Sequence, residues 1–201
     1  MFSISNIEMK HFFGKKTRDI YGRHLGQVVT ILKNSDGELE SIKVDQSEGR
    51  LVKYSAEQIM TDKEEIVIIP EWKIQAEQMI KELNTFRNRM VALEAMLERK
   101  EVSKEIYGNL KSNQQHSMNS LEEKNIEFIS SMKEQQKELD RQINELTNFL
   151  VEIRTDKKEG KIQSSKYAKA SKSIEQNLNF LFLEKKDIED IIKKSEEKKL
   201  D

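Results

Sequence analysis

The stretch Ile69-Pro70-Glu71-Trp72-Lys73 marks the point at which the character of this sequence changes, and it contains the chain's only proline and its only tryptophan. Before it, short apolar runs are broken by Gly, Asn and Asp; after it, a charged, helix-like pattern runs almost to the last residue. Proline suits the first turn of a helix, where an N–H group would lack a partner anyway, and Glu71 adds negative charge that the helix dipole favours. The stretch therefore predicts a junction between a β domain and a long helix.

The composition favours long exposed helices over a single globule. Of 201 residues, 35% are charged and only 36% are hydrophobic, with 35 basic against 36 acidic side chains and a net charge of -1. The absence of cysteine excludes a disulfide framework and cysteine–zinc sites, and it fits a reducing cytoplasm. No apolar run approaches the roughly 20 residues of a membrane span, and no signal-peptide pattern is expected at the start.

Residues 1–70 have the pattern of a small β domain. Val28 to Leu32 reads as a buried strand, and Asn34-Ser35-Asp36-Gly37 is a turn signal that leads into the next apolar run. Ile42 and Val44 alternate with charged residues, as on a half-buried strand, and the run from Ile66 to Ile69 closes the domain. About five short strands at such spacing predict a small barrel, so the expected fold class is α+β.

The helical region is predicted in two parts, residues 71–155 with a break near 99–104, and residues 156–201 after a turn at 156–163. Apolar residues at alternating steps of four and three form a coiled-coil seam in the first part. The members of this seam are Trp72, Ala76, Met79, Leu83, Phe86, Met90, Leu93 and Leu97. A second seam contains Phe128, Met132, Leu139 and Leu146, with polar Asn125, Gln135 and Gln142 in the same register. Polar residues in such a seam cost stability but can fix the register and the number of partners.

The last helix carries more apolar residues than one seam requires, because Phe180, Phe182 and Leu183 widen its apolar face. We favour the interpretation that these residues pack inside the protein's own hairpin or filament. The alternative is a contact in which this helix lies in the groove of a partner protein.

A basic and aromatic stretch near the N-terminus is a candidate contact for acidic lipid or nucleic acid. It consists of Lys10, Phe12, Phe13, Lys15, Lys16 and Arg18. The favoured interpretation is that both Phe side chains pack on the β domain and that the basic side chains are solvated.

The sequence contains no pattern that predicts catalysis, a cofactor or a metal site. His11, His24 and His116 are far apart and have no ligand spacing with another histidine or carboxylate. The sequence has no phosphate-binding loop and no nucleophile elbow, and exposed helix faces account for its paired carboxylates. We therefore expect a protein that is not an enzyme.

Two groups of residues carry a resemblance to known families. The glycines Gly14, Gly22 and Gly26 with Asp19 and Val28 resemble a PRC-barrel domain. With Ile69 to Lys73 and the turn from Val102 to Tyr107, nearly the whole chain resembles the CdvA family of archaeal cell-division proteins. The resemblance implies filaments at mid-cell, association with the inner face of the membrane, ESCRT-III-like partners of the CdvB type, and an association with DNA.

One part of the family pattern is not expected here. Some CdvA proteins end in a linker and a short strand that docks on the partner, whereas this helical pattern runs through Ile192 into a charged end. The residues alone indicate a β domain fused to an oligomerising coiled coil. Two other functions stay open, a nucleic-acid- or ribosome-associated adaptor that uses the PRC-like barrel, and a coiled-coil spacer with no filament role.

Overall fold

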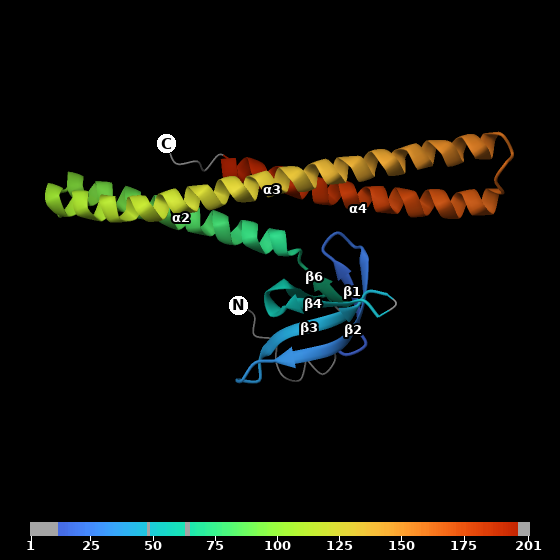
Figure 1. The fold of residues 1–201 in the computed structure, drawn as a ribbon, viewed down its shortest axis with the longest axis horizontal. Helices are drawn as coiled ribbons and strands as arrows, with labels where there is room; N and C mark the ends of the chain where they lie inside the picture. The colour runs from blue at the N-terminus through green and yellow to red at the C-terminus, as the bar shows by residue number, and fades with distance from the viewer. Residues whose placement is uncertain (1–11, 48, 63–64, 197–201) are drawn as a thin grey trace. The chain divides into compact units, whose positions relative to one another are not determined.

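The chain has an α+β fold, as predicted, with a β sheet followed by long helices (Figure 1). The computed structural model describes residues 12–47, 49–62 and 65–196. The chain divides into two compact units, residues 1–74 and residues 75–201. The first unit contains the sheet and the first turn of the first long helix, and the second contains the remaining helical residues.

The sheet has six strands in the order β4-β3-β2-β1-β6-β5. Their bounds are β1 Lys16–Asp19, β2 His24–Lys33, β3 Leu39–Asp45, β4 Leu51–Ser55, β5 Ile59–Asp62 and β6 Glu65–Ile68, with a 3-10 helix, η1 Ala56–Gln58, between β4 and β5. β1 and β6 pair in parallel, and the other neighbours are antiparallel. Strands β4 and β5 are the two edges, so the sheet stays open where the sequence predicts a barrel.

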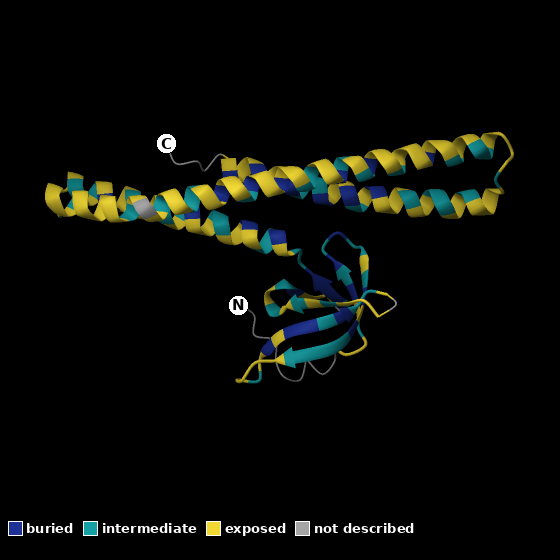
Figure 2. Cartoon of the chain, viewed as in Figure 1, coloured by how far each residue is buried: buried dark blue, intermediate teal, exposed yellow. Residues whose placement is uncertain are grey.

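The core of the first unit is formed by residues that alternate along the strands. Ile42 and Val44 on β3 are fully buried, as is Ile66 on β6, and they pack with Val28 and Phe12. The alternation in β3 arises because successive side chains of a strand point to opposite faces of the sheet. Figure 2 shows the buried strand positions as dark blue segments.

Turn chemistry fixes the ends of β1 and β2. A carboxylate oxygen of Asp19 accepts hydrogen bonds from the backbone N–H groups of Tyr21, at 3.0 Å, and Arg23, at 2.8 Å. Gly26 has a φ of 133° and lies against the backbone of Asp45, whose carbonyl oxygen would be 1.9 Å from an added Cβ. Only glycine combines that φ with such a close approach between strands.

Three helices follow the junction: α2 Glu71–Glu98, α3 Lys104–Lys158 and α4 Ser164–Glu196. Ser103 caps α3, because its hydroxyl oxygen accepts a hydrogen bond from the N–H of Ile106 at 3.2 Å. Gly160, with a φ of 74°, follows the end of α3 as a helix stop. The breaks between helices therefore fall at residues 99–103 and 159–163, and α3 continues to Lys158, beyond the expected boundary at 155.

Two glycine substitutions should have opposite effects on stability. Gly26→Ala should destabilise the β domain by at least about 3 kcal/mol, because its Cβ would meet the backbone of Asp45. Gly108→Ala should stabilise α3 by about 0.5–1 kcal/mol, because Gly108 lies in a helix with no atom within 4 Å of an added Cβ. Hydrogen exchange of the sheet amides measures the effect of Gly26→Ala. Thermal unfolding followed at 222 nm measures the effect of Gly108→Ala. A tolerated Gly26→Ala would contradict the close approach.

Candidate functional site: the helical unit

Helix α3 is the element against which the other helices of this unit lie. It has 55 residues, compared with 28 in α2 and 33 in α4. Its first half lies beside α2 and its second half beside α4 (Figure 1), and both neighbours run antiparallel to it. The helical unit thus consists of two hairpins that share α3.

The predicted seam residues are placed within these hairpins. On α2, Ala76, Leu83 and Leu93 are buried, with relative exposures of 0%, 3% and 7%, and Trp72 at the start of the helix is buried too. On α3, Met132 and Leu139 are buried. The remaining members of the predicted seams are partly buried, namely Met79, Phe86, Met90, Leu97, Phe128 and Leu146. The predicted seams therefore lie on the more buried faces of α2 and α3.

The α2–α3 hairpin is sparsely packed. A hollow of about 450 Å³ lies between its helices, lined by the apolar side chains of Phe86 and Leu121 and by polar and charged residues. Leaving aside position 116, no residue from 104 to 124 of α3 is buried. Val91 on α2 and Ile106 on α3 expose 60% and 51% of their surface. This hairpin has more apolar surface than two helices cover.

The C-terminal half of α4 is packed much more closely onto α3. Its buried residues are Leu178, Leu181, Glu184, Ile188, Ile191, Ile192 and Ser195. Three side-chain amides of α3 donate hydrogen bonds to α4: Asn125 Nδ2 to Ser195 O at 3.3 Å, Gln135 Nε2 to Glu184 Oε1 at 3.0 Å, and Gln136 Nε2 to Glu189 Oε1 at 3.0 Å. Two ion pairs also join the helices, Lys133–Glu196 at 2.8 Å and Lys185–Asp140 at 2.6 Å. We call this set of cross-helix bonds the C-terminal clasp.

Two bonds of the clasp supply donors to polar groups at the end of α4 and in its buried face. The carbonyl of Ser195 lies in the last turn of α4, where carbonyl groups have no intrahelical donor, and the Asn125 amide supplies one. Glu184 is only 7% exposed, and Gln135 donates to its carboxylate. The hydrogen bond to Asp140 also raises the pKa of Lys185, so this ammonium group stays charged. The clasp thus fixes the end of α4 on the middle of α3.

The first half of α4 differs from its second half. No residue from 164 to 177 is buried. Among the described residues, this segment is joined to α3 by one ion pair, Arg154–Glu175 at 3.3 Å. Figure 2 shows this change along α4, from yellow and teal near the turn to dark blue further on. The α3–α4 hairpin is therefore closed most firmly at the end remote from its own turn.

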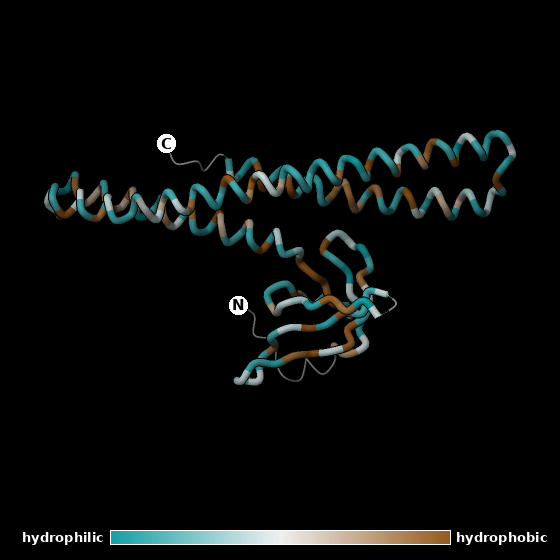
Figure 3. Tube along the Cα trace, viewed as in Figure 1, coloured by the Kyte–Doolittle hydropathy of each residue, from teal (hydrophilic) through white to brown (hydrophobic). Residues whose placement is uncertain are grey.

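Several apolar side chains of the α3–α4 hairpin stay uncovered. Phe182 and Leu183, two of the residues considered for a partner contact, expose 53% and 45% of their surface, while Phe180 is partly buried. Phe149 on α3 is exposed by 45%. Figure 3 shows hydrophobic positions, in brown, interspersed among hydrophilic ones along both helices. Exposed large apolar side chains of this kind are candidates for an interaction surface.

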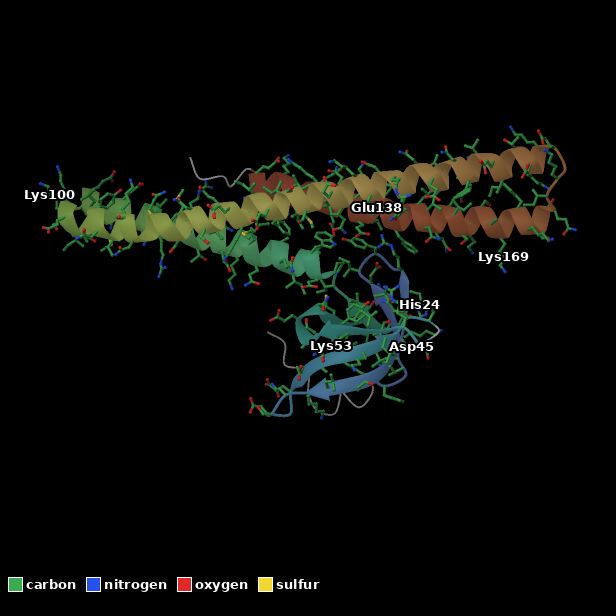
Figure 4. All side chains as sticks on the ribbon, in the orientation of Figure 1. His24, Asp45, Lys53, Lys100, Glu138 and Lys169 are labelled. Atoms are coloured by element: carbon green, nitrogen blue, oxygen red, sulfur yellow. The ribbon has the colours of Figure 1, made fainter. Side chains whose placement is uncertain are left out.

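The outer surface of α3 also carries fixed charge. Hydrogen bonds from Arg141 and Gln142 lower the pKa of Glu138 to about 2, so that carboxylate stays ionised at any ordinary pH (Figure 4). Arg141 in turn lies 3.5 Å from Glu145, one helical turn further on. Such exposed pairs contribute little to stability but keep the helix surface hydrated.

The N-terminal basic stretch is divided by the fold. Phe12 is 2% exposed and belongs to the core of the β domain, and Arg18 bonds to Asp62 at 2.6 Å and Glu65 at 3.0 Å. Neither residue is free for an acidic ligand, because one is covered and the other neutralised. Phe13 is 69% exposed, so the interpretation that both Phe side chains pack on the β domain holds for Phe12 and is wrong for Phe13. Lys15 is partly buried and Lys16 is exposed. Lys10 lies outside the described residues.

The described residues show no group that could hold a metal ion, that is, no cluster of three or more His, Cys, Asp and Glu side chains. His24 is exposed, and His11 and the side chain of His116 lie outside the description. Within the same part of the chain, no helix is both long and apolar enough to cross a membrane.

The pair Gln135–Glu184 should show the energetics of a buried polar contact. Gln135→Leu should destabilise the protein by about 1–3 kcal/mol, because the buried Glu184 carboxylate loses a donor. The double variant Gln135→Leu/Glu184→Leu should recover most of this loss, because two apolar side chains need no such bond. Urea unfolding followed at 222 nm measures both. Asn148→Leu, at an exposed position of α3, is the control and should change stability by less than about 0.5 kcal/mol. A double variant that is less stable than Gln135→Leu alone would contradict this account.

Comparison with known proteins agrees with this architecture. The family model of the CdvA-like coiled-coil domain matches residues 71–201, which is the helical region from the first residue of α2 onward. The chain is also similar to the Cell division protein A of Sulfolobus acidocaldarius, with 22% identity over 183 residues, which cover 91% of this chain and 76% of that protein. Because the family model covers well over half of its length, the chain belongs to the CdvA-like coiled-coil family, a family of archaeal cell-division proteins.

Proposed function

We propose that this protein is a non-enzymatic scaffold of archaeal cell division that self-assembles through its helical unit into filaments at the division site. In this role it works with ESCRT-III-like proteins of the CdvB type at the inner face of the membrane. Membership of the CdvA-like family supports a role in cell division, and that family is not an enzyme family. The filament, the partner and the membrane belong to the proposal.

The observation that carries self-assembly is the apolar surface left uncovered on both hairpins. Val91 and Ile106 belong to the sparsely packed α2–α3 hairpin, and Phe182 and Leu183 lie on the outside of α4. Burying a large apolar side chain contributes roughly 1.5–3 kcal/mol, so covering these four by a second copy is a substantial driving force. Uncovered apolar residues on two different hairpins of one chain allow contacts that continue from copy to copy, as a filament requires.

Loss of this apolar surface should abolish assembly. The variants Val91→Ser/Ile106→Ser and Phe182→Ser/Leu183→Ser should each yield a smaller species in light scattering and no filaments in negative-stain microscopy. Substituting buried Leu83 would be a poorer test, because a charge there would break the hairpin itself. The control is Leu51→Ser/Met60→Ser, which removes two side chains of the sheet that are each 53% exposed. If the two helical variants assemble like the parent, the proposed surface is wrong.

The same α4 variant also tests the contact with an ESCRT-III-like partner. If Phe182 and Leu183 serve assembly, we expect partner binding to decline only as far as assembly does, because several linked copies bind more tightly than one. Binding of a CdvB-type protein is measured by sedimentation, alongside the light scattering. Partner binding that is lost while filaments persist would instead assign these side chains to the partner.

A further inference from the structure

The turn between α3 and α4 is the most basic part of a chain whose net charge is only -1. Residues 157–172 contain six lysines and one acidic residue, Glu159, and no arginine. The lysines are Lys157, Lys158, Lys161, Lys166, Lys169 and Lys172. They fall in the last turn of α3, the connection, and the first turns of α4, so the end of the hairpin gathers them in one place.

Four of these lysines are not neutralised by the protein. Lys157 contacts the Ser164 hydroxyl, and Lys161 contacts Glu159 and Asp156. Lys158, Lys166, Lys169 and Lys172 are exposed, and none of them forms an ion pair with another described residue. We call these four residues the lysine tip. Lys169 lies on the side of α4 that faces away from α3 (Figure 4).

Three members of the lysine tip form a row. Lys166, Lys169 and Lys172 recur every three residues on α4, so each is a neighbour of the next on the helix surface. Like charges at this spacing repel one another and destabilise an isolated helix. No residue from 164 to 177 is buried, so this half of α4 has little packing with which to offset that cost. An external anion would relieve the repulsion.

We propose that the lysine tip is a binding site for an anionic lipid surface. Clusters of four or more basic residues bind the negative surface of a bilayer by electrostatic attraction, without insertion of the chain. The described structure fits this mode, because no large apolar side chain between residues 152 and 181 is exposed. Binding should therefore be reversible and sensitive to salt, as expected for charges screened by ions.

The residue types favour lipid over nucleic acid as the source of the negative charge. Proteins that read or stack on nucleic acids use arginine forks and exposed aromatic side chains, and the stretch 157–172 contains no arginine and one aromatic residue, Tyr167, which is partly buried. The lysines also surround the end of a hairpin instead of lining a groove. A flat and continuous array of charges suits that arrangement better than the two separate phosphate rows of a duplex.

The site differs from the N-terminal basic stretch in two respects. In that stretch Phe12 is buried and Arg18 is paired with two carboxylates, whereas all four residues of the lysine tip are exposed and unpaired among the described residues. The inference rests on the proposed function only in assuming that the protein acts at a membrane. It does not depend on filaments, because the tip is complete within one chain.

Vesicle flotation with the full chain tests the site. Vesicles of phosphatidylcholine with phosphatidylglycerol should bind the parent protein, and vesicles of phosphatidylcholine alone should not. Changing all four lysines of the tip to Gln should weaken binding to the anionic vesicles at least about tenfold, since each lysine near such a surface adds to the attraction. Changing the same four to Arg should retain binding, because the charge is retained.

A matched control has the same change in charge elsewhere. Lys81, Lys104, Lys124 and Lys186 are exposed on the three helices, and changing these four to Gln should leave vesicle binding within about twofold of the parent. Equal losses of vesicle binding in the tip variant and the control variant would overturn the proposed site, and so would a tip variant that binds like the parent. A tip variant that loses binding to duplex DNA but keeps binding to vesicles would overturn it in favour of nucleic acid. Light scattering without vesicles reports assembly separately, so failure of the proposed filament is distinguished from failure of the tip.

Discussion

The burial of the C-terminal half of α4 on α3 is the interaction on which the helical unit depends. In proteins, most of the stability of a helix comes from packing of its apolar face and not from intrinsic propensity. Ile188 and Ser195 on α4 have no exposed surface, and the side-chain amide of Asn125 on α3 donates a hydrogen bond to the last turn of α4. Because this contact lies far from the α3–α4 turn, the turn itself need not hold the helices together. Both ends of the unit can then stay sparsely packed and remain free to meet other surfaces.

Much of this fold could be predicted from local sequence patterns. The proline and glutamate at the start of α2, the cap at Ser103 and the stop at Gly160 locate the helix ends, because each acts on the backbone beside it. The heptad pattern identified which faces are apolar but not what covers them, since a helix of the same chain and a helix of a second copy present the same seam. The predicted barrel is an open sheet for a related reason. Whether the edge strands β4 and β5 close depends on tertiary geometry that no local signal encodes.

The candidate sites were less predictable because their members meet only after folding. Arg18 bonds to Asp62 and Glu65, which are 44 and 47 residues away, so nothing near Arg18 reveals its neutralisation. The sequence placed Asn125 and Gln135 in a seam, but their partners Ser195 and Glu184 looked like ordinary surface residues of a charged helix. The lysine tip was present in the composition of residues 157–172, yet the balanced charge of the helices as a whole concealed it.

The helical unit therefore divides its surface chemistry along its length. In the α2–α3 hairpin, uncovered Val91 and Ile106 favour contact with another apolar surface, and that attraction is largely insensitive to salt. At the other end of α3, the lysine tip attracts a charged surface by a force that salt weakens. The closely packed middle separates the two, so a change in ionic conditions can release one contact while the other persists. If the protein assembles as proposed, it can leave a charged surface without first coming apart, because its two kinds of contact do not share residues.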